Sequence, residues 1–209
     1  QTNGEGSSLV NLESGDNKKI RYDPDHWRPS QLKGGSPGLT ENELPNLRIS
    51  EIHYHPGQVS EVEREAGFDD RDQFEFIEFK NIGEEAIQMD GFQLSGGVSY
   101  TFSDYQLDAG QYVIVASNVE AFRFRYGSRD NVVGIFEEGK LSDSGETILL
   151  KSDIGELIHD FNYKSSWYNE SNGDGASLEV INLDAEISQW RRKSHWRSSA
   201  FSGGSPGLP

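Results

Sequence analysis

The sequence predicts an all-β domain, built as a sandwich or a barrel, and three of its features support this prediction. Short stretches rich in valine, isoleucine, phenylalanine and tyrosine recur along residues 47–182, as buried and half-buried strands require. Turn-forming residues separate these stretches at intervals of about 8 to 12 residues, the spacing typical of sandwiches and barrels. A chain of 209 residues is also long enough to bury a sizeable core.

The predicted strands follow one another along the middle of the chain. The first, 47–55, ends before the turn residue Pro56. Val98, Tyr100 and Phe102 alternate with polar residues, as in a strand with one buried face. Uninterrupted apolar runs in other segments indicate strands covered on both faces. The full set of predicted strands is 47–55, 72–83, 87–97, 98–104, 111–117, 131–138, 146–155, 156–164 and 176–182.

One segment is a helix candidate, the stretch NVEAFRFRYG at residues 118–127. Asn118 is a residue type that caps helix N-termini, and Gly127 is one that ends helices. The sequence therefore predicts one or two helical turns between them.

A segment near the start of the chain is repeated at its end. Sliding the chain by 169 residues places residues 3–39 on residues 172–208 without a gap. Within this repeat, HWRPSQLKGGSPGL falls on HWRSSAFSGGSPGL with ten of fourteen positions identical. We expect residues 1–39 to be the closing segment of a preceding module, with a linker to residue 45, and residues 46–209 to be one complete module. The alternative is one fold element used twice inside a single domain.

The repeated segment has properties that suit a module boundary. Trp27 and Trp196 are large apolar side chains that can anchor an irregular segment on a sheet. The GGSPG motif that follows combines flexible glycines with a fixed proline. This combination suits a chain that leaves one module and enters the next.

Six stretches in register resemble the lamin tail domain family in its bacterial form. The resemblance covers essentially all of residues 46–209 and implies an immunoglobulin-like β-sandwich without a shared catalytic set. It also implies a module of a larger secreted or cell-surface protein, in which such modules occur in series. The stretches are ISEIHYHP (49–56), FEFIEFKNIGEEAIQMDGFQLS (74–95), LDAGQYVIVAS (107–117), LSDSGETILLKSDIGELIHDFNY (141–163), DGASLEVIN (174–182) and HWRSSAFSGGSPG (195–207).

The composition excludes several classes of function. The chain has 35 acidic and 19 basic residues and a formal net charge of −16, which disfavours binding to nucleic acid and to anionic membranes. It contains no cysteine, no apolar run long enough for a membrane span, and no phosphate-binding loop, dinucleotide fingerprint or HExxH motif. Together with the repeated ending, the resemblance to the lamin tail domain family implies a non-catalytic extracellular or cell-surface module that contacts a protein or cell-surface partner and neighbouring modules of its own chain.

Acidic loops are the candidate cation ligands. The stretch EREAGFDDRDQ contains Asp69, Asp70 and Asp72, and LSDSGE adds Asp143 and Glu146. Calcium is held by six to eight oxygen atoms, which carboxylate-rich loops provide. These five residues are the calcium candidates of the chain, and no other cofactor is expected. The alternative, which we favour, is a solvated acidic surface that keeps the chain soluble.

Two histidines near the first strand form a further candidate. His53 and His55 stand two residues apart, so on a strand they point to the same face. A shared metal ion would need one or two more ligands. We favour the alternative of a structural pair.

Aromatic side chains in SSWYNESNGDG are the candidate sugar ligands, since Trp167 and Tyr168 stand among amide side chains there. An exposed Trp167 would favour ligand binding, whereas a buried one would show that the ring closes the end of the core. The alternative function is accordingly a carbohydrate- or calcium-binding accessory domain.

Overall fold

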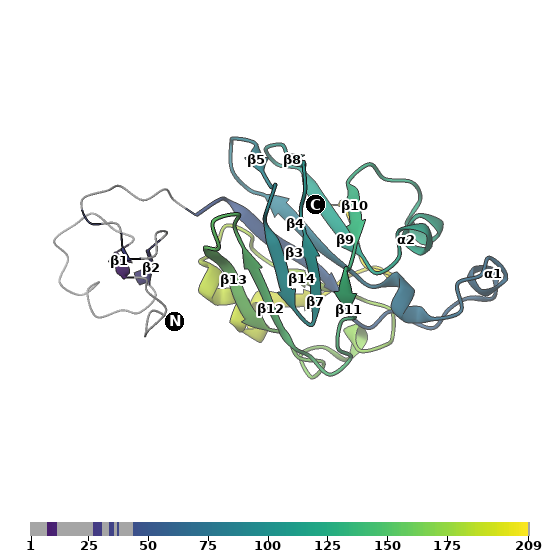
Figure 1. Ribbon diagram of the computed structural model, residues 1–209. Helices are drawn as coiled ribbons and strands as arrows, with labels where there is room; N and C mark the ends of the chain where they lie inside the picture. The colour runs from purple at the N-terminus through teal and green to yellow at the C-terminus, as the bar shows by residue number, and fades with distance from the viewer. Residues whose placement is uncertain (1–7, 12–26, 31–33, 36, 38–43, 209) are drawn as a thin grey trace.

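The computed structural model describes residues 8–11, 27–30, 34, 35, 37 and 44–208. From residue 44 onward the chain forms two sheets that face one another (Figure 1). The predicted all-β, immunoglobulin-like sandwich is therefore confirmed.

The larger sheet has six strands and contains the first and the last strand of the 44–208 body. All of its neighbouring strands are antiparallel except β9 and β10, which are parallel. In spatial order it consists of β10 (Val132–Ile135), β9 (Tyr112–Ala116), β4 (Phe76–Asn81), β3 (Leu47–His53), β14 (Leu178–Val180) and β15 (Trp196–Ser198).

The second sheet has five antiparallel strands, and a two-stranded ribbon lies outside both sheets. The five strands are β11 (Glu138–Gly139), β7 (Val98–Thr101), β6 (Gln93–Gly96), β12 (Thr147–Lys151) and β13 (Leu157–Asn162). The ribbon pairs β5 (Ile87–Gln88) with β8 (Gln106–Leu107). The predicted strand 87–97 is thus two strands, because a turn at Gly91, whose φ is 80°, separates them.

The core lies between the two sheets and is rich in aromatic rings. Phe79 of the larger sheet meets Phe102 edge-on, with ring centroids 5.5 Å apart. Between the edge strands β15 and β13, the ring centroid of Trp196 lies 5.4 Å from that of Phe161, and both rings are buried. Burying a side chain of this size stabilises the fold by about 1.5–3 kcal/mol, so these contacts hold the sheets together.

The predicted helix is confirmed as α2 (Val119–Tyr126). Asn118 Oδ1 accepts hydrogen bonds from the N–H groups of Glu120 and Ala121 at 2.9 and 3.1 Å, and Gly127 ends the helix with a φ of 81°. A second helix, α1 (Glu61–Glu65), was not predicted because its five residues are too few to show an apolar period. Short 3-10 helices span Arg71–Phe74, Asn169–Ser171, Ile187–Arg191 and Lys193–His195.

A closing hairpin, β14–β15, completes the larger sheet. Its strands pair Leu178 with Ser198, Glu179 with Arg197 and Val180 with Trp196, and β14 also pairs with β3 along its other edge. At the open end of the hairpin, Ser177, just before β14, and Ser199, just after β15, are hydrogen-bonded to each other. The N–H of Ser199 donates to the Ser177 carbonyl at 3.0 Å, and the N–H of Ser177 donates to Ser199 Oγ at 2.9 Å.

The strands β1 (Leu9–Asn11) and β2 (Trp27–Pro29) form a hairpin of the same design (Figure 1). Their register is Leu9 with Pro29, Val10 with Arg28 and Asn11 with Trp27, and adding 169 to each number gives the register of β14–β15. The serine pair is also reproduced. The N–H of Ser30 donates to the Ser8 carbonyl at 2.7 Å, and the N–H of Ser8 donates to Ser30 Oγ at 3.0 Å.

None of the helices in the described part of the chain is long and apolar enough to cross a membrane.

Candidate functional site

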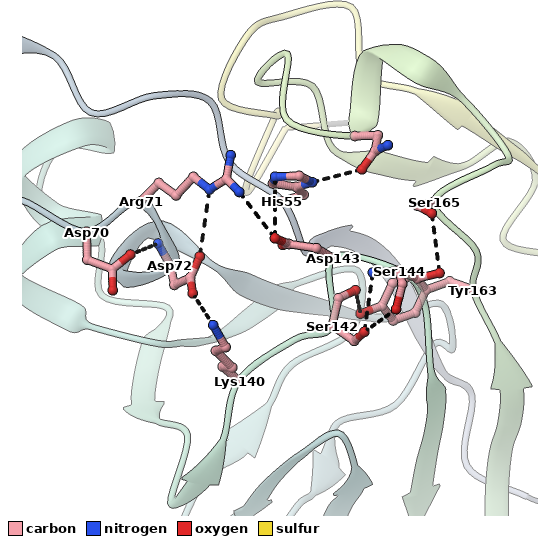
Figure 2. A network of polar contacts seen from close by, with 11 residues as sticks. His55, Asp70, Arg71, Asp72, Lys140, Ser142, Asp143, Ser144, Tyr163 and Ser165 are labelled. Atoms are coloured by element: carbon pink, nitrogen blue, oxygen red, sulfur yellow. Dashed lines mark hydrogen bonds and ion pairs between the residues drawn. The ribbon is translucent and has the colours of Figure 1, made fainter.

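Two loops, between β3 and β4 and between β11 and β12, bring a group of polar side chains together (Figure 2). His55 follows β3, Asp72 lies in the 3-10 helix Arg71–Phe74, and Glu75 directly precedes β4. Asp143 comes from the loop between β11 and β12. We call His55, Asp72, Glu75 and Asp143 the loop cluster.

The three carboxylates of the loop cluster converge on one point. One ligand oxygen each from Asp72, Glu75 and Asp143 lies within 4.8 Å of the other two. Two basic side chains lie at the rim. Lys140 Nζ contacts Asp72 Oδ2 at 2.7 Å, and Arg71 Nη2 contacts Asp143 Oδ2 at 3.2 Å (Figure 2). Surface ion pairs of this kind contribute little to stability, so they leave the carboxylates able to exchange partners.

Glu75 is the buried member of the cluster, with none of its surface exposed. Its Oε2 accepts a hydrogen bond from the N–H of Leu141 at 2.9 Å, whereas Oε1 has no hydrogen-bond partner among the described residues. Burial, together with the charges of Asp72 and Asp143, raises the pKa of Glu75 to about 9. The buried carboxyl therefore holds a proton at neutral pH.

His55 is held in a fixed orientation beside Asp143. Its Nδ1 lies 2.8 Å from Asn172 Oδ1, and its Nε2 lies 3.5 Å from Asp143 Oδ2 (Figure 2). Gly173, with a φ of 93°, lies behind the imidazole, and a Cβ at that position would approach the ring to 3.1 Å. Glycine is required there for its backbone conformation and for the space that the ring occupies.

The predicted calcium residues are only partly brought together. Asp72 and Asp143 meet in the cluster. Asp70 Oδ1 instead caps its own 3-10 helix by accepting the N–H of Asp72 at 3.0 Å. Glu146 Oε1 accepts from the N–H of Ser142 at 2.8 Å and from the Tyr163 hydroxyl at 3.0 Å, and Asp69 is exposed.

Sequence reasoning missed Glu75 and the role of His55. Glu75 stands between two phenylalanines in FEF, an alternation that is typical of a solvent-facing residue. The structure buries it against the loop between β11 and β12, where the N–H of Leu141 donates to its Oε2. His53 does not share a site with His55. Its buried ring lies edge-on against Phe76, 5.3 Å between centroids.

The predicted sugar ligands are part of the core and its border. Trp167 is 7% exposed, and its ring centroid lies 6.0 Å from that of Trp196. The Tyr168 hydroxyl donates to the Trp196 carbonyl at 2.7 Å. This placement favours the alternative that Trp167 closes the end of the core, since little of its face is open for a sugar ring to stack on.

A second polar site, also missed, holds the GGSPG motif against the larger sheet. It consists of the buried carboxylates of Glu51, Glu78 and Glu179 on β3, β4 and β14, and we call it the glutamate site. The N–H of Ser205 donates to Glu51 Oε1 at 2.9 Å, and its hydroxyl donates to Glu179 Oε1 at 2.5 Å. The N–H of Gly207 donates to Glu78 Oε2.

The surroundings of the glutamate site change the pKa values of its carboxyl groups. Burial raises the pKa of Glu51 and of Glu78, and repulsion between carboxylates raises both further. The site is therefore partly protonated near neutral pH, which limits the cost of burying several acids together.

Comparison with known protein families identifies the body of the chain. A family model described as Lamin Tail Domain matches residues 40–165, which is more than half of the 209 residues. The matched region ends before β14, so it contains the loop cluster residues but not the closing hairpin. No curated protein matches the chain.

Proposed function

Because this chain belongs to the lamin tail domain family, we propose that it is a structural and interaction module of a larger secreted or cell-surface protein of the bacterial type, in which such modules stand in series. The family is an immunoglobulin-like, non-enzymatic module type. The partners that we propose are neighbouring modules of the same chain and a protein or cell-surface partner.

The observation that carries the serial arrangement is the second hairpin. The β1–β2 hairpin has the register of β14–β15 and the same pair of serine hydrogen bonds. In the 44–208 body, β14 lies between β15 and β3. The edge of β3 that such a hairpin would join is already paired with β14. The β1–β2 hairpin is therefore expected to pair with the equivalent strand in the body of a further module.

In each GGSPG motif, a glycine lies close to the serine that precedes the first strand of its hairpin. The similarity of the two hairpins therefore extends into these motifs. A Cβ on Gly35 would lie 2.9 Å from Ser8 Oγ, and a Cβ on Gly204 would lie 3.1 Å from Ser177 Oγ. The two glycines and the two serines correspond at the same offset of 169 residues. The resemblance between the hairpins thus includes the segment that folds back over the strands.

The proposal can be tested on the mature protein isolated from its source. Cells and medium are fractionated, and the polypeptide that contains these peptides is identified by its intact mass and sequence coverage. We expect a chain larger than 23.4 kDa, outside the cytoplasm, with another lamin tail body before the β1–β2 hairpin. A cytoplasmic species of 23.4 kDa would contradict the serial arrangement.

A matched pair of variants tests whether the β1–β2 hairpin belongs to the 46–209 body or to another module. Trp196→Ala removes a fully buried ring from the core, and we expect it to lower the free energy of unfolding by about 3–5 kcal/mol. Trp27→Ala changes the equivalent residue of the other hairpin, and we expect less than about 0.5 kcal/mol for unfolding of the 46–209 body. Equal losses would favour one domain that uses the element twice.

A further inference from the structure

We propose that the loop cluster is a binding site for a first-row divalent metal ion, held by the carboxylates of Asp72, Glu75 and Asp143. His55 lies outside the group of mutually close ligand atoms, and its Nε2, 3.5 Å from Asp143 Oδ2, becomes the nitrogen ligand when its ring shifts toward the ion. This proposal goes beyond the structural role above and does not depend on it. Carboxylate oxygens within 4.8 Å of one another are close enough for a single ion to contact all three. Because acidic groups also gather on surfaces without any ion, the proposal rests on two further features.

The first feature is the buried oxygen of Glu75. Oε1 has no hydrogen-bond partner among the described residues, and no part of the side chain is exposed. A buried polar atom without a partner destabilises the fold. A cation bound between Glu75, Asp72 and Asp143 would replace the proton of the Glu75 carboxyl and give this oxygen a partner.

The second feature is the lone pair of His55. The Asn172 oxygen that contacts Nδ1 can only accept, so Nδ1 carries the hydrogen. Nε2 is buried, has no hydrogen-bond partner among the described residues, and lies 3.5 Å from Asp143 Oδ2. A ring fixed through Nδ1–H with a free Nε2 is also the arrangement that metal-binding histidines adopt.

The basic side chains at the rim do not block such an ion. Lys140 is 70% exposed, so its ammonium group can move into solvent when a metal ion contacts Asp72. Arg71 contacts Asp143 through Oδ2 only, which leaves Oδ1 for a ligand bond. The net charge of −16 also raises the concentration of cations near the surface.

The types of ligand atom in the loop cluster indicate which class of metal ion it would bind. Calcium prefers six to eight oxygens, whereas imidazole together with carboxylates suits manganese, iron or zinc. The loop cluster offers three carboxylates and one imidazole. We therefore infer a first-row divalent ion in place of the calcium expected from the acidic loops alone.

Manganese(II) is the probe for the test, because its electron paramagnetic resonance signal reports binding directly. The full chain is titrated with Mn²⁺, and we expect one ion per chain. Glu75→Gln keeps the shape of the buried side chain and should weaken binding at least tenfold. Asp69→Asn removes an exposed acid from the same loop and should change affinity less than twofold. Unfolding of each variant is measured to show that the fold is kept.

The nitrogen ligand has its own readout. Electron spin echo modulation of bound Mn²⁺ should show a coupled nitrogen that is lost in His55→Gln. Its absence in the unmodified chain would overturn the assignment of His55. Absence of Mn²⁺ binding, or equal weakening by Glu75→Gln and Asp69→Asn, would overturn the site and indicate only general attraction by negative charge. Displacement of Mn²⁺ by Ca²⁺ at a lower concentration than by Zn²⁺ would overturn the class of metal.

Discussion

The glutamate site predicts that the protein becomes less stable as the pH rises above neutral. Glu51 is 2% exposed, and burial, with repulsion from Glu78, raises its pKa to about 8. An acid whose pKa is higher in the folded state keeps its proton on folding. The stability that it contributes is therefore fully present below its ordinary pKa of 4.5 and is lost as the pH rises through about 8.

The magnitude follows from the pKa of Glu51. One pH unit corresponds to about 1.36 kcal/mol, and about 1.5 units separate pH 6.5 from the folded pKa. Glu51 alone should lower the free energy of unfolding by about 2 kcal/mol between pH 6.5 and pH 8.5. Glu75 and Glu78, whose pKa values are also raised, add to this loss.

The perturbation is Glu51→Gln, and the assay is urea unfolding followed by tryptophan fluorescence at pH 6.5 and pH 8.5. Ser177 and Ser205 both donate to Oε1, so the amide oxygen of glutamine can keep both hydrogen bonds. We expect the variant to lose about 2 kcal/mol less than the unmodified chain over this range. Glu84→Gln, at an exposed position, is the matched control. An unchanged pH dependence in Glu51→Gln would refute the reasoning.

Three further predictions concern stability. Asn118→Ala removes the cap of α2 and should cost about 1 kcal/mol in urea unfolding; no change would show that the cap is dispensable. Gly96→Ala would force a side chain onto the Thr147 carbonyl at a φ of 120° and should cost at least about 2 kcal/mol. Gly67→Ala, with open space around it, should cost less, and equal losses would contradict the steric argument. Burial lowers the pKa of His159 to about 3, so its contribution is present above pH 6.5 and lost as the pH falls toward 3; acid unfolding of His159→Gln should show a weaker pH dependence below pH 6.5.

The sequence by itself determined the strands and their class. Alternation at Val98, Tyr100 and Phe102 and the capping residue Asn118 act locally, so both β7 and α2 could be predicted. The repeat was also visible, because identical residues at a fixed offset need no structure to be recognised. Boundaries were less certain where a turn such as that at Gly91 interrupts an apolar run.

The tertiary structure alone decided which polar residues meet. Glu51, Glu78 and Glu179 come from three strands and share one site because β3 lies between β4 and β14. Asp72 and Asp143 were both candidates, but their meeting with Glu75 depends on how two loops pack. A sequence pattern reports neighbours along the chain, whereas both sites are made by residues whose separation in the chain says nothing about their distance in space. Burial likewise follows from packing, and burial is what raises the pKa of Glu51 and Glu75.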